Sequence, residues 1–416
     1  MQIDRTSGIL KFRPSANHAG RAVACAVTAA MLLTGCDGYP RESPHDDYQP
    51  REAGTAVTTA DMNADGMQDI VLGYTVNGLE GYYAGTGALI LQNATVPGTF
   101  GRSLDLAAPT SADNPWSITT GDLDGSGGPD VAIGMGANKI RLFFQGAGAV
   151  TTRTDISYIG VPFGLVATDL NGDGRTDLAV TGGNNGGQEG IVLILQSATQ
   201  NGVFLPDRPL LPAGRLPYAL VSSDVNGDGR TDLISAGVES GANVVSVYLQ
   251  SPVAAGTFSP RSTYIGGSQS FSLAIADLNN DDRPDIAVAD SGANPAGVQV
   301  LFQDSVQPGI FRQPLVLTSR STREIAAADV NGDNRTDLVL NLGRSVSVLQ
   351  QEPTQAGVFM LTDSQALDCD GNQMALDDLN ADDSLDIVLA CGERAAVLFN
   401  SRSQPGRFTS PQKVGR

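Results

Sequence analysis

Seven short segments of the chain place oxygen-bearing side chains at the same spacing. Each follows the nine-residue pattern D-x-[ND]-x-[DS]-x-x-x-D, and aliphatic residues come after it. The residues at positions 1, 3, 5 and 9 are Asp61, Asn63, Asp65, Asp69; Asp122, Asp124, Ser126, Asp130; Asp169, Asn171, Asp173, Asp177; Asp224, Asn226, Asp228, Asp232; Asp277, Asn279, Asp281, Asp285; Asp329, Asn331, Asp333, Asp337; and Asp378, Asn380, Asp382, Asp386. Ca²⁺ binds about six to eight oxygens from carboxylates, amides and backbone carbonyls. These side chains are therefore candidate calcium ligands.

The spacing suggests how one such loop would surround an ion. Alternate residues of a tight loop point inward, so Asp224, Asn226 and Asp228 can converge on one point. Position 7 would offer its backbone carbonyl, which leaves the side chain of Arg230 to face solvent. Asp232, at position 9, would open the next strand and close the coordination shell. Without a cation, each loop would hold about three like charges at short range, which favours a bound ion.

Position 6 is where the loop must turn sharply. It is Gly in four copies and Asp282, Asn334 or Asp383 in the others, and these residue types tolerate a left-handed backbone. Polar hairpin turns without metal are the alternative, because Asn, Asp and Gly also cap turns. Seven copies in phase favour structural calcium, at up to seven sites, over metal-free turns. Na⁺ or Mg²⁺ is the alternative ion, although Mg²⁺ disfavours this many protein ligands. The second copy is the weakest, because Ser126 replaces a carboxylate.

The spacing of the loops predicts the fold. Their first residues are separated by 61, 47, 55, 53, 52 and 49 residues, which is typical of repeat architectures. Each unit holds four short β segments, for example Phe271–Asp277, Asp285–Asp290, Gly297–Gln303 and Arg312–Thr318, and no capped helical pattern is present. We predict an all-β, seven-bladed β-propeller of four-stranded blades. An open β-solenoid is the alternative.

The two ends of the repeat region suggest how the ring closes. The chain finishes with Gly406–Val414, which matches the last segment of a unit, whereas the first unit begins near Thr55 with the segment that precedes the loop. We expect the C-terminal strand to pair with the first blade.

The N-terminal region is typical of an export signal rather than of a folded domain. Basic residues precede the apolar stretch Ala22–Gly35, which is too short to span a bilayer, where about 20 residues are needed. The stretch ends in Leu-Thr-Gly followed by Cys36, which resembles a bacterial lipobox. We therefore expect a signal peptide over 1–35, lipidation of Cys36, a flexible tether over 36–52 and the propeller over 53–416. An ordinary cleaved signal or an uncleaved anchor is the alternative.

The composition excludes several classes of function. The formal net charge of −19 argues against nucleic acid as a partner, because phosphate binding requires clustered Lys and Arg. The chain has two histidines, so His-based catalysis and His-ligated zinc have few residues available. Beyond Cys36, Cys369 and Cys391 form an even pair, and an exported compartment permits a disulfide between them. Two free buried thiols are the alternative.

The seven loops, together with recurrent Gly-x-Phe turns such as Gly309 to Phe311, resemble the FG-GAP/VCBS repeat family, whose units also form integrin α-subunit heads. The resemblance covers about residues 53–416. It implies a calcium-loop propeller with the ligand positions given above, and many members of that family bind proteins or glycans. The second unit lacks the Gly-x-Phe turn, and an integrin-type Gly-Ala-Pro tripeptide is absent. Integrin-like ligand recognition is therefore not expected.

We predict a non-enzymatic binding or adhesion scaffold for a protein or glycan, anchored by lipid on Cys36 to the bacterial envelope, at the periplasmic face or the cell surface. Trp116, the single tryptophan, is a candidate partner contact, and packing between blades is its alternative role. A propeller lectin is a second hypothesis, although the recurring aromatic is the Phe of the Gly-x-Phe turn. A carbohydrate-active lyase or hydrolase is the third, although nearly every recurrent Asp belongs to a metal loop.

Overall fold

The computed structural model describes residues 56–77, 83–107, 110–111, 114–136, 138–146, 149–158, 160–183, 189–205, 209–239, 242–266, 270–292 and 297–416. All of these lie within one compact unit, Pro50–Arg416. The predicted signal peptide, Cys36 and the tether over 36–52 lie outside the described residues. Within them, no helix has the length and apolar character that a bilayer crossing requires.

The predicted seven-bladed, all-β propeller is confirmed, and each blade is a sheet of antiparallel strands in chain order. The first four blades contain β1 (Ala56–Ala60), β2 (Asp69–Asn77), β3 (Tyr83–Ile90) and β4 (Leu104–Asp105), with β5 (Thr110–Ser111) also on β3; β6 (Pro115–Gly121), β7 (Asp130–Met135), β8 (Lys139–Gly146) and β9 (Ala149–Ser157); β10 (Val161–Thr168), β11 (Asp177–Gly183), β12 (Gly190–Ile194) and β13 (Leu210–Pro212); and β14 (Arg215–Ser223), β15 (Asp232–Glu239), β16 (Ala242–Tyr248) and β17 (Ser262–Ile265).

The last three blades contain β18 (Ser270–Ala276), β19 (Asp285–Asp290), β20 (Gly297–Leu301) and β21 (Leu315–Thr318); β22 (Glu324–Ala328), β23 (Asp337–Asn341), β24 (Ser345–Gln351) and β25 (Phe359–Ala366); and β26 (Met374–Asp377), β27 (Asp386–Cys391), β28 (Arg394–Leu398) and β31 (Gln412–Val414). A short hairpin of β29 (Asn400–Ser401) and β30 (Gln404–Phe408) precedes β31.

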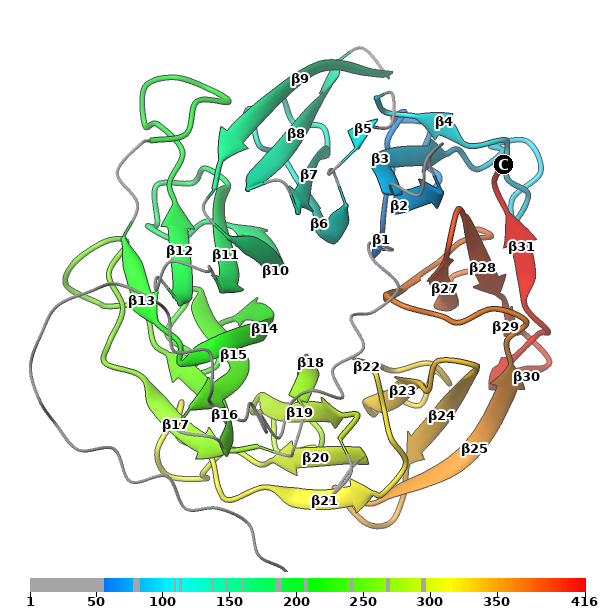
Figure 1. Ribbon diagram of the computed structural model, residues 1–416. Coiled ribbons are helices and arrows are strands. Elements are labelled where there is room, and N and C mark those ends of the chain that lie inside the picture. Colours follow the sequence, from blue (N-terminus) through cyan, green and yellow to red (C-terminus); the bar gives the residue numbers. More distant parts are fainter. Residues whose placement is uncertain are drawn as a thin grey trace, which may run out of the picture. The chain divides into compact units, whose positions relative to one another are not determined.

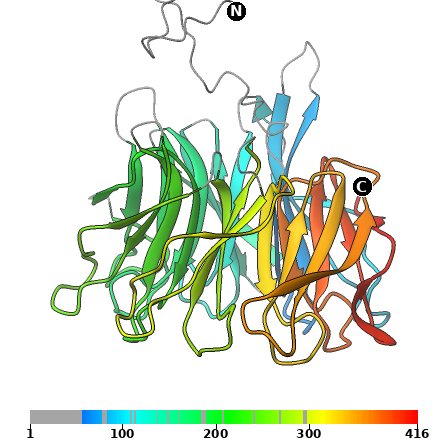
Figure 2. The ribbon, with the colours of Figure 1, turned by 90° about the horizontal axis from the view of Figure 1, so that it is seen from below.

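The blades stand around a central axis, with the first strand of each blade innermost and the last strand at the rim (Figure 1). Figure 2 shows the strands running roughly along this axis, so that the connections gather at the two ends of the ring. The nine-residue candidate metal loops join the first and second strands of every blade, and the Gly-x-Phe turns follow the third strand. Both kinds of connection therefore lie at the same end of the ring, which we call the loop end.

The core is built between neighbouring blades. The second strand of a blade is covered on both faces, and β7, β19 and β23 are buried along their whole length. This is why these strands read as nearly continuous aliphatic runs instead of alternating with polar residues. One cluster, for instance, packs Ile234 and Val245 of the fourth blade against Ile286 and Val288 of the fifth. Stability is thus spread over a series of similar interfaces.

The ring closes in a different way from the one expected. β31 pairs with β28 inside the seventh blade, so the prediction that the C-terminal strand joins the first blade is wrong. Within the described residues, every blade has its own inner and outer strands, so the first and last repeats do not share a strand.

Side chains hold the first and seventh blades together instead. An apolar cluster joins Ile70 and Leu72 to Val388 and Val397. The Thr59 hydroxyl donates to the carboxylate of Asp377 at 2.7 Å. Closure therefore uses the same type of apolar interface as the other junctions.

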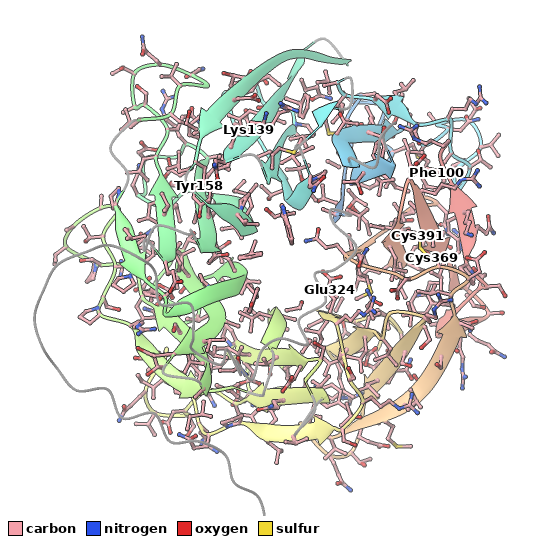
Figure 3. The ribbon with its side chains drawn as sticks, viewed as in Figure 1. Phe100, Lys139, Tyr158, Glu324, Cys369 and Cys391 are labelled. Carbon is pink, nitrogen blue, oxygen red and sulfur yellow. A yellow bond between two sulfur atoms is a disulfide. The ribbon has the colours of Figure 1, made fainter. Side chains whose placement is uncertain are left out.

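The structure joins Cys369 and Cys391 in a disulfide, the pair considered from the sequence (Figure 3). It connects the segment before β26 to the end of β27, at the opposite end of the seventh blade from its metal loop. The same segment is fixed by neighbours, because the amide of Gly371 donates to the carbonyl of Gly343 at 2.8 Å.

Candidate metal centres and the channel cavity

The seven candidate metal loops share one backbone conformation. Position 6 has a positive φ in every copy, from 61° at Asp282 to 88° at Gly127, which confirms the left-handed turn expected from the sequence. Position 4 is left-handed as well, and the sequence analysis missed it. It is Ala64, Gly125, Gly172, Gly227, Asn280, Gly332 and Ala381. Glycine or asparagine occupies position 4 in five of the seven copies, and this pattern could have indicated the left-handed conformation.

The backbone of each loop wraps around the carboxylate at position 1. In the fourth copy the amide of Gly229 donates to Oδ2 of Asp224 at 2.7 Å, and the amide of Asp228 donates to Oδ1 at 3.1 Å. The amide of Asp228 also donates to Oδ1 of Asn226 at 3.0 Å. The position 6 amide makes the equivalent bond in all seven copies, at 2.7–3.0 Å. Positions 1 and 3 are thus turned toward the interior of the loop, as a chelating loop requires.

The aspartate at position 9 connects its loop to the rest of the blade. It is fully buried in all seven copies. In the fourth copy, Oδ2 of Asp232 accepts from the amide of Val225 at 3.0 Å, and Oδ1 accepts from the amide of Gln250, two residues after β16, at 2.7 Å. Burial raises the pKa of the Asp232 carboxyl to about 6, although the two backbone donors act in the opposite direction. A nearby cation would therefore stabilise the charged form of this carboxylate.

Two observations support the fit of a cation to the second and seventh loops. The carboxylate oxygens of Asp122, Asp124 and Asp130 lie within 4.8 Å of one another, and they are the one such acidic group among the described residues. Oδ1 of Asp122 and Oδ1 of Asn380 in the seventh loop are buried without a hydrogen-bond partner. Buried oxygen atoms of this kind are expected to have a partner. The second loop, which the sequence marked as weakest, is strengthened by a carboxylate at position 3, where the other copies have Asn.

The prediction for position 7 is wrong in one respect. Arg230 does not direct its guanidinium away from the loop, because it forms an ion pair with Asp228 at position 5 and is about one-third exposed. Arg283 and Asp281 pair in the same way at 2.5 Å. The neighbouring carboxylates attract the guanidinium, and this attraction was not considered when position 7 was treated as a backbone ligand alone.

Comparison with known proteins shows the family of this chain. A family model described as FG-GAP-like repeat matches residues 122–180, 169–235, 224–288 and 277–340, which together span more than half of the chain. The chain belongs to the FG-GAP-like repeat family. No curated protein matches it.

A crystal structure of BBS1N in complex with ARL6DN is 11% identical and covers 82% of this chain and 89% of that chain, with a TM-score of 0.49. A lectin of Agrocybe aegerita, solved to show recognition of non-reducing terminal N-acetylglucosamine, is 16% identical and covers 87% and 80%, with a TM-score of 0.41.

Adjacent FG-GAP-like repeats are connected at their metal loops by a buried amide side chain. Nε2 of Gln303, in the fifth repeat, donates to the carbonyl of Val225 in the fourth loop at 2.8 Å. The residues that make the equivalent bond to the preceding loop are Gln145, Gln196, Gln250, Gln351 and Asn400. The sequence analysis missed these residues, although a polar amide closing an apolar third strand was a recurring signal.

The Gly-x-Phe turn of each FG-GAP-like repeat packs against the metal loop of the preceding repeat. A Cβ atom on Gly309 would lie 3.2 Å from the Cβ of Asn226, and the other five turn glycines face position 3 of the preceding loop in the same way, at 3.1–3.7 Å. Phe311 is buried in the apolar cluster between the fourth and fifth blades. In the second repeat, β8 and β9 instead continue into a tight hairpin at Gly146 and Ala149, so the first loop lacks this cover.

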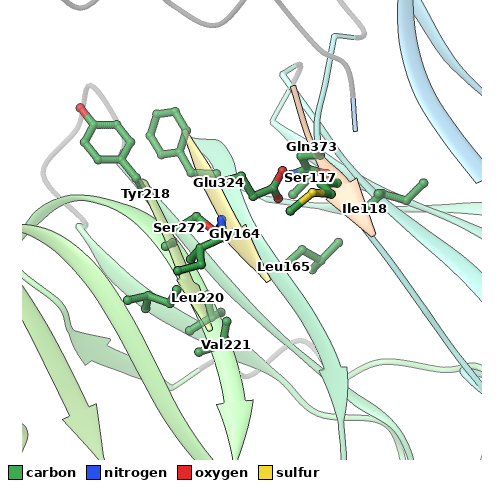
Figure 4. Close-up of a pocket in the computed structure, with 15 residues that line it drawn as sticks. Ser117, Ile118, Gly164, Leu165, Tyr218, Leu220, Val221, Ser272, Glu324 and Gln373 are labelled. Atoms are coloured by element: carbon green, nitrogen blue, oxygen red, sulfur yellow. Dashed lines mark hydrogen bonds between the residues drawn. The ribbon is translucent and has the colours of Figure 1, made fainter. Parts of the chain in front are cut away.

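A cavity of about 260 Å³ lies among the innermost strands of six repeats (Figure 4). Its polar lining includes Ser117, Ser272, Glu324 and Gln373. These residues lie at or near the starts of β6, β18, β22 and β26, so the cavity is at the end of the channel away from the metal loops. We call this the channel cavity.

Trp116 lies next to the channel cavity and is partly buried. It makes an edge-to-face contact with Phe163 of the third repeat, with ring centroids 5.5 Å apart, and Phe163 contacts Tyr218 of the fourth repeat at 5.2 Å. Trp116, Phe163 and Tyr218 each stand six residues before the first Asp of their loop. The Phe of the Gly-x-Phe turn is therefore not the one recurring aromatic, and comparing the residues before each loop would have found this second set.

Proposed function

We propose that this protein is a calcium-stabilised propeller that binds a protein or glycan partner without catalysing a reaction. The observation that carries the proposal is the division between the two ends of the ring. The loop end repeats one acidic framework in every blade, and the other end carries side chains that differ from blade to blade. A structural ion site at one end and a recognition surface at the other accounts for both features.

Calcium is proposed as the ion because the donor set is made of carboxylate and amide oxygens. In each loop, positions 1, 3, 5 and 9 would hold it, and Ser126 would contribute a hydroxyl or a water in the second loop. The bound ion would supply positive charge that offsets the repulsion among the acidic side chains. The left-handed residues at positions 4 and 6 shape the loop. The hydrogen bond from the amide side chain of the next blade holds the loop in place.

We further propose that the protein is exported and anchored to the bacterial envelope through a lipid on Cys36. The support for this part comes from the sequence, in which an apolar stretch ends in a lipobox-like segment. A polar segment of about 16 residues then precedes the first blade. A flexible tether of that length would reach about 20 Å on average, which would allow the propeller to turn relative to the membrane.

A non-enzymatic role is proposed because the recurrent acidic residues are used within the loops. Each position 9 carboxylate accepts two backbone amides, so it is poorly placed to exchange a proton with a substrate. A lyase or hydrolase would need a separate acid–base pair. The lectin alternative is also non-enzymatic, and it restricts the partner to sugars.

A binding screen tests the proposed function. The purified protein would be presented to arrays of glycans and of envelope proteins, once with calcium and once with excess chelator. We expect selective binding of one partner class that is lost or weakened when the metal is removed. Turnover of a polysaccharide in the same assay would contradict the proposal, and so would calcium-dependent folding with no partner in either array.

A further inference from the structure

The carboxylate at position 5 of the candidate metal loops has one oxygen with a fixed role. In the six loops that carry Asp there, Oδ1 accepts the backbone amide of position 7 at 2.9–3.1 Å. The loop uses this oxygen to hold its own backbone. Oδ2 is therefore the oxygen that is left to face a cation or another side chain, and its surroundings differ among the repeats.

An arginine contacts Oδ2 of position 5 in four successive repeats, whose blades form one arc of the ring (Figure 1). In the fourth to sixth repeats the arginine stands at position 7 of the same loop, and in the seventh it comes from the turn between β29 and β30. The pairs are Arg230 with Asp228, Arg283 with Asp281 at 2.5 Å, Arg335 with Asp333 at 3.4 Å, and Arg402 with Asp382 at 3.0 Å.

The third loop has nearly the same sequence as the fourth and a different arrangement. The two loops differ only at position 2, which is Leu or Val. Arg175, at position 7 of the third loop, donates to Oδ1 of Asn201 at 2.6 Å and to Oε1 of Gln196 at 3.4 Å. Asn201 stands immediately before the turn glycine, where the fourth, fifth and sixth repeats have Ala255, Pro308 and Ala356, which offer no side-chain acceptor. An acceptor on the turn thus draws Arg175 away from position 5.

An arginine on Oδ2 opposes a cation in the same loop in two ways. Its charge-assisted hydrogen bond must be broken or shared before Oδ2 can bind an ion. Its positive charge would also repel the ion at short range. In the metal-free protein, however, the same charge offsets the repulsion among the acidic side chains of the loop. The arginine is thus both a substitute for the ion and its competitor.

The arginines of the fourth and fifth loops have a further feature that favours their release. Nε of Arg230 and Nε of Arg283 are buried without a hydrogen-bond partner. A buried donor without an acceptor costs free energy, and water would satisfy it once the side chain turned outward. The ion pair is therefore a contact that a cation can displace, and the affinity of the loop depends on how strongly the arginine holds it.

We propose that the arginines of the fourth to seventh repeats compete with calcium for position 5, so that the ring takes up calcium in stages. The third loop, whose arginine is held by Asn201, fills at a lower calcium concentration than the four arginine-paired loops. Below that second concentration, the arginines supply the counter-charge in their arc. The inference rests on the proposed calcium-stabilised propeller. It assigns the residues that set the calcium affinity of their own loops: Arg230, Arg283, Arg335 and Arg402.

The amide signals of two glycines separate the loops within one calcium titration. Gly174 and Gly229 stand at position 6 of the third and fourth loops and donate their amides to the position 1 carboxylate at 2.8 and 2.7 Å. NMR of protein prepared with isotope-labelled glycine follows both signals as calcium is added to the chelated protein. We expect the midpoint of the Gly229 signal at a calcium concentration about tenfold or more above that of Gly174.

Arg230→Met removes the competitor from the fourth loop and gives position 7 the residue that the first loop carries there, Met67. The midpoint of the Gly229 signal should move to a calcium concentration about three- to tenfold lower. In excess chelator the same variant should melt at a lower temperature, because the loop loses its internal counter-charge. Tighter calcium binding together with lower metal-free stability distinguishes competition from a purely structural role of the arginine.

Asn201→Ala makes the opposite change in the third loop. It introduces the residue that the fourth repeat has before its turn glycine, Ala255, and it leaves Arg175 free to reach Asp173. The midpoint of the Gly174 signal should rise about threefold or more. Adding Arg175→Met to this variant should bring the midpoint back down, which shows that the arginine, rather than the lost amide, causes the change.

The matched control is Arg312→Met, at the loop end of the fifth repeat. Arg312 pairs with Asp304 at 4.0 Å and follows the Gly309 turn, which packs on the fourth loop. The substitution removes the same charge as Arg230→Met, but from a carboxylate that is not a candidate ligand. It should leave the midpoint of the Gly229 signal unchanged.

Equal midpoints of the Gly174 and Gly229 signals in the unmodified protein would overturn the inference. A Gly229 midpoint that Arg230→Met leaves unchanged, or that Arg312→Met lowers equally, would also overturn it. If Arg230→Met does not fold, the Asn201→Ala variants decide in its place. All these outcomes leave the calcium-stabilised propeller standing, because both loops bind the ion. Failure of both signals to shift up to about 10 mM calcium would instead reject calcium binding itself, and the inference with it.

Discussion

At the scale of single residues, the position 9 aspartates are buried carboxylates whose oxygens accept backbone amides. Asp386 is fully buried, and its two carboxylate oxygens accept the amides of Leu379 and Asn400 at 3.0 and 2.7 Å. An amide side chain would place an N–H group against one of these donors. The carboxylate is therefore required even before any metal is considered.

Replacing Asp386 with Asn should lower the free energy of unfolding by about 1–3 kcal/mol, because one buried backbone amide loses its acceptor. Equilibrium unfolding in denaturant measures the change. The control is Asp383→Asn in the same loop, where φ is 63° and the sixth loop already has Asn334 with φ of 63°. This second change should cost less than about 0.5 kcal/mol. Equal losses of unfolding free energy in the two variants would show that the buried hydrogen bonds do not account for the destabilisation.

Because of the position 9 residues, we also expect the stability of the protein to depend on pH. Burial raises the pKa of Asp232 to about 6 and that of Asp285 and Asp386 to about 7 in the metal-free protein. These values lie above the usual value of 3.8, so the folded state binds more protons than the unfolded chain between about pH 4 and 7. The stability that protonation contributes is present at low pH and is lost as pH rises through 6 to 7.

We therefore expect the melting temperature in excess chelator to fall between pH 5 and about pH 7.5. Differential scanning calorimetry over this range provides the measurement. A calcium-loaded sample should show a smaller fall, because the cation takes the place of the protons. A chelated protein that becomes more stable toward pH 7.5 would contradict the expected burial of these carboxyls.

At the scale of elements, the important unit is the contact between a Gly-x-Phe turn and the preceding metal loop. Gly309 and Gly229 both have positive φ, of 76° and 82°. Gly229 has open space where a side chain would begin, whereas a Cβ on Gly309 would lie 3.0 Å from Leu249 and 3.2 Å from Asn226. Substituting Gly229 therefore tests backbone strain alone, whereas substituting Gly309 tests backbone strain together with packing between blades.

Gly229→Ala should cost about 1–2 kcal/mol through backbone strain alone. Gly309→Ala should cost about 1–3 kcal/mol more, because the added methyl must displace the neighbouring blade. Unfolding by denaturant with both variants provides the comparison. If the two alanine variants are equally stable, the turn does not pack closely on the preceding loop.

The elements also show how far the sequence can predict the structure. The loops, the four-stranded units and the left-handed position 6 follow from local residue types, and all were predicted correctly. Ring closure was not, because the same strand pattern fits an outer strand of the seventh blade or of the first, and local residue types do not distinguish the pairing of β31 with β28 that the structure shows. The bond from Gln303 to Val225 joins residues 78 apart, which no local pattern contains.

At the scale of the whole molecule, seven similar interfaces form a ring in which each candidate metal loop lies at a junction between blades. Each loop is held by its own strands. An amide side chain of the next blade adds a bond to the first six loops, and a glycine turn packs on every loop except the first. An ion in the loop would therefore stabilise a junction as well as a turn. This arrangement explains why the proposed calcium sites should affect the stability of the complete propeller.

The channel cavity shows a different limit of prediction at this scale. Trp116, Phe163 and Tyr218 are about 50 residues apart in sequence, and the ring brings them into contact. Trp116 was considered from the sequence as a partner contact or as packed between blades. Its contact with Phe163 shows that Trp116 packs between blades, which a single sequence position could not reveal, and its role as a partner contact stays a prediction.

The central claim is that divalent ions in the loops hold the ring together, and thermal unfolding with and without metal tests it most directly. The same sample would be melted in excess calcium, in excess magnesium and after exhaustive chelation. Ligand at about 100 times its Kd stabilises by about 2.7 kcal/mol per site, so several occupied loops should raise the melting temperature by more than about 10 °C in calcium, and by less in magnesium. A melting temperature that chelation leaves unchanged would contradict the account.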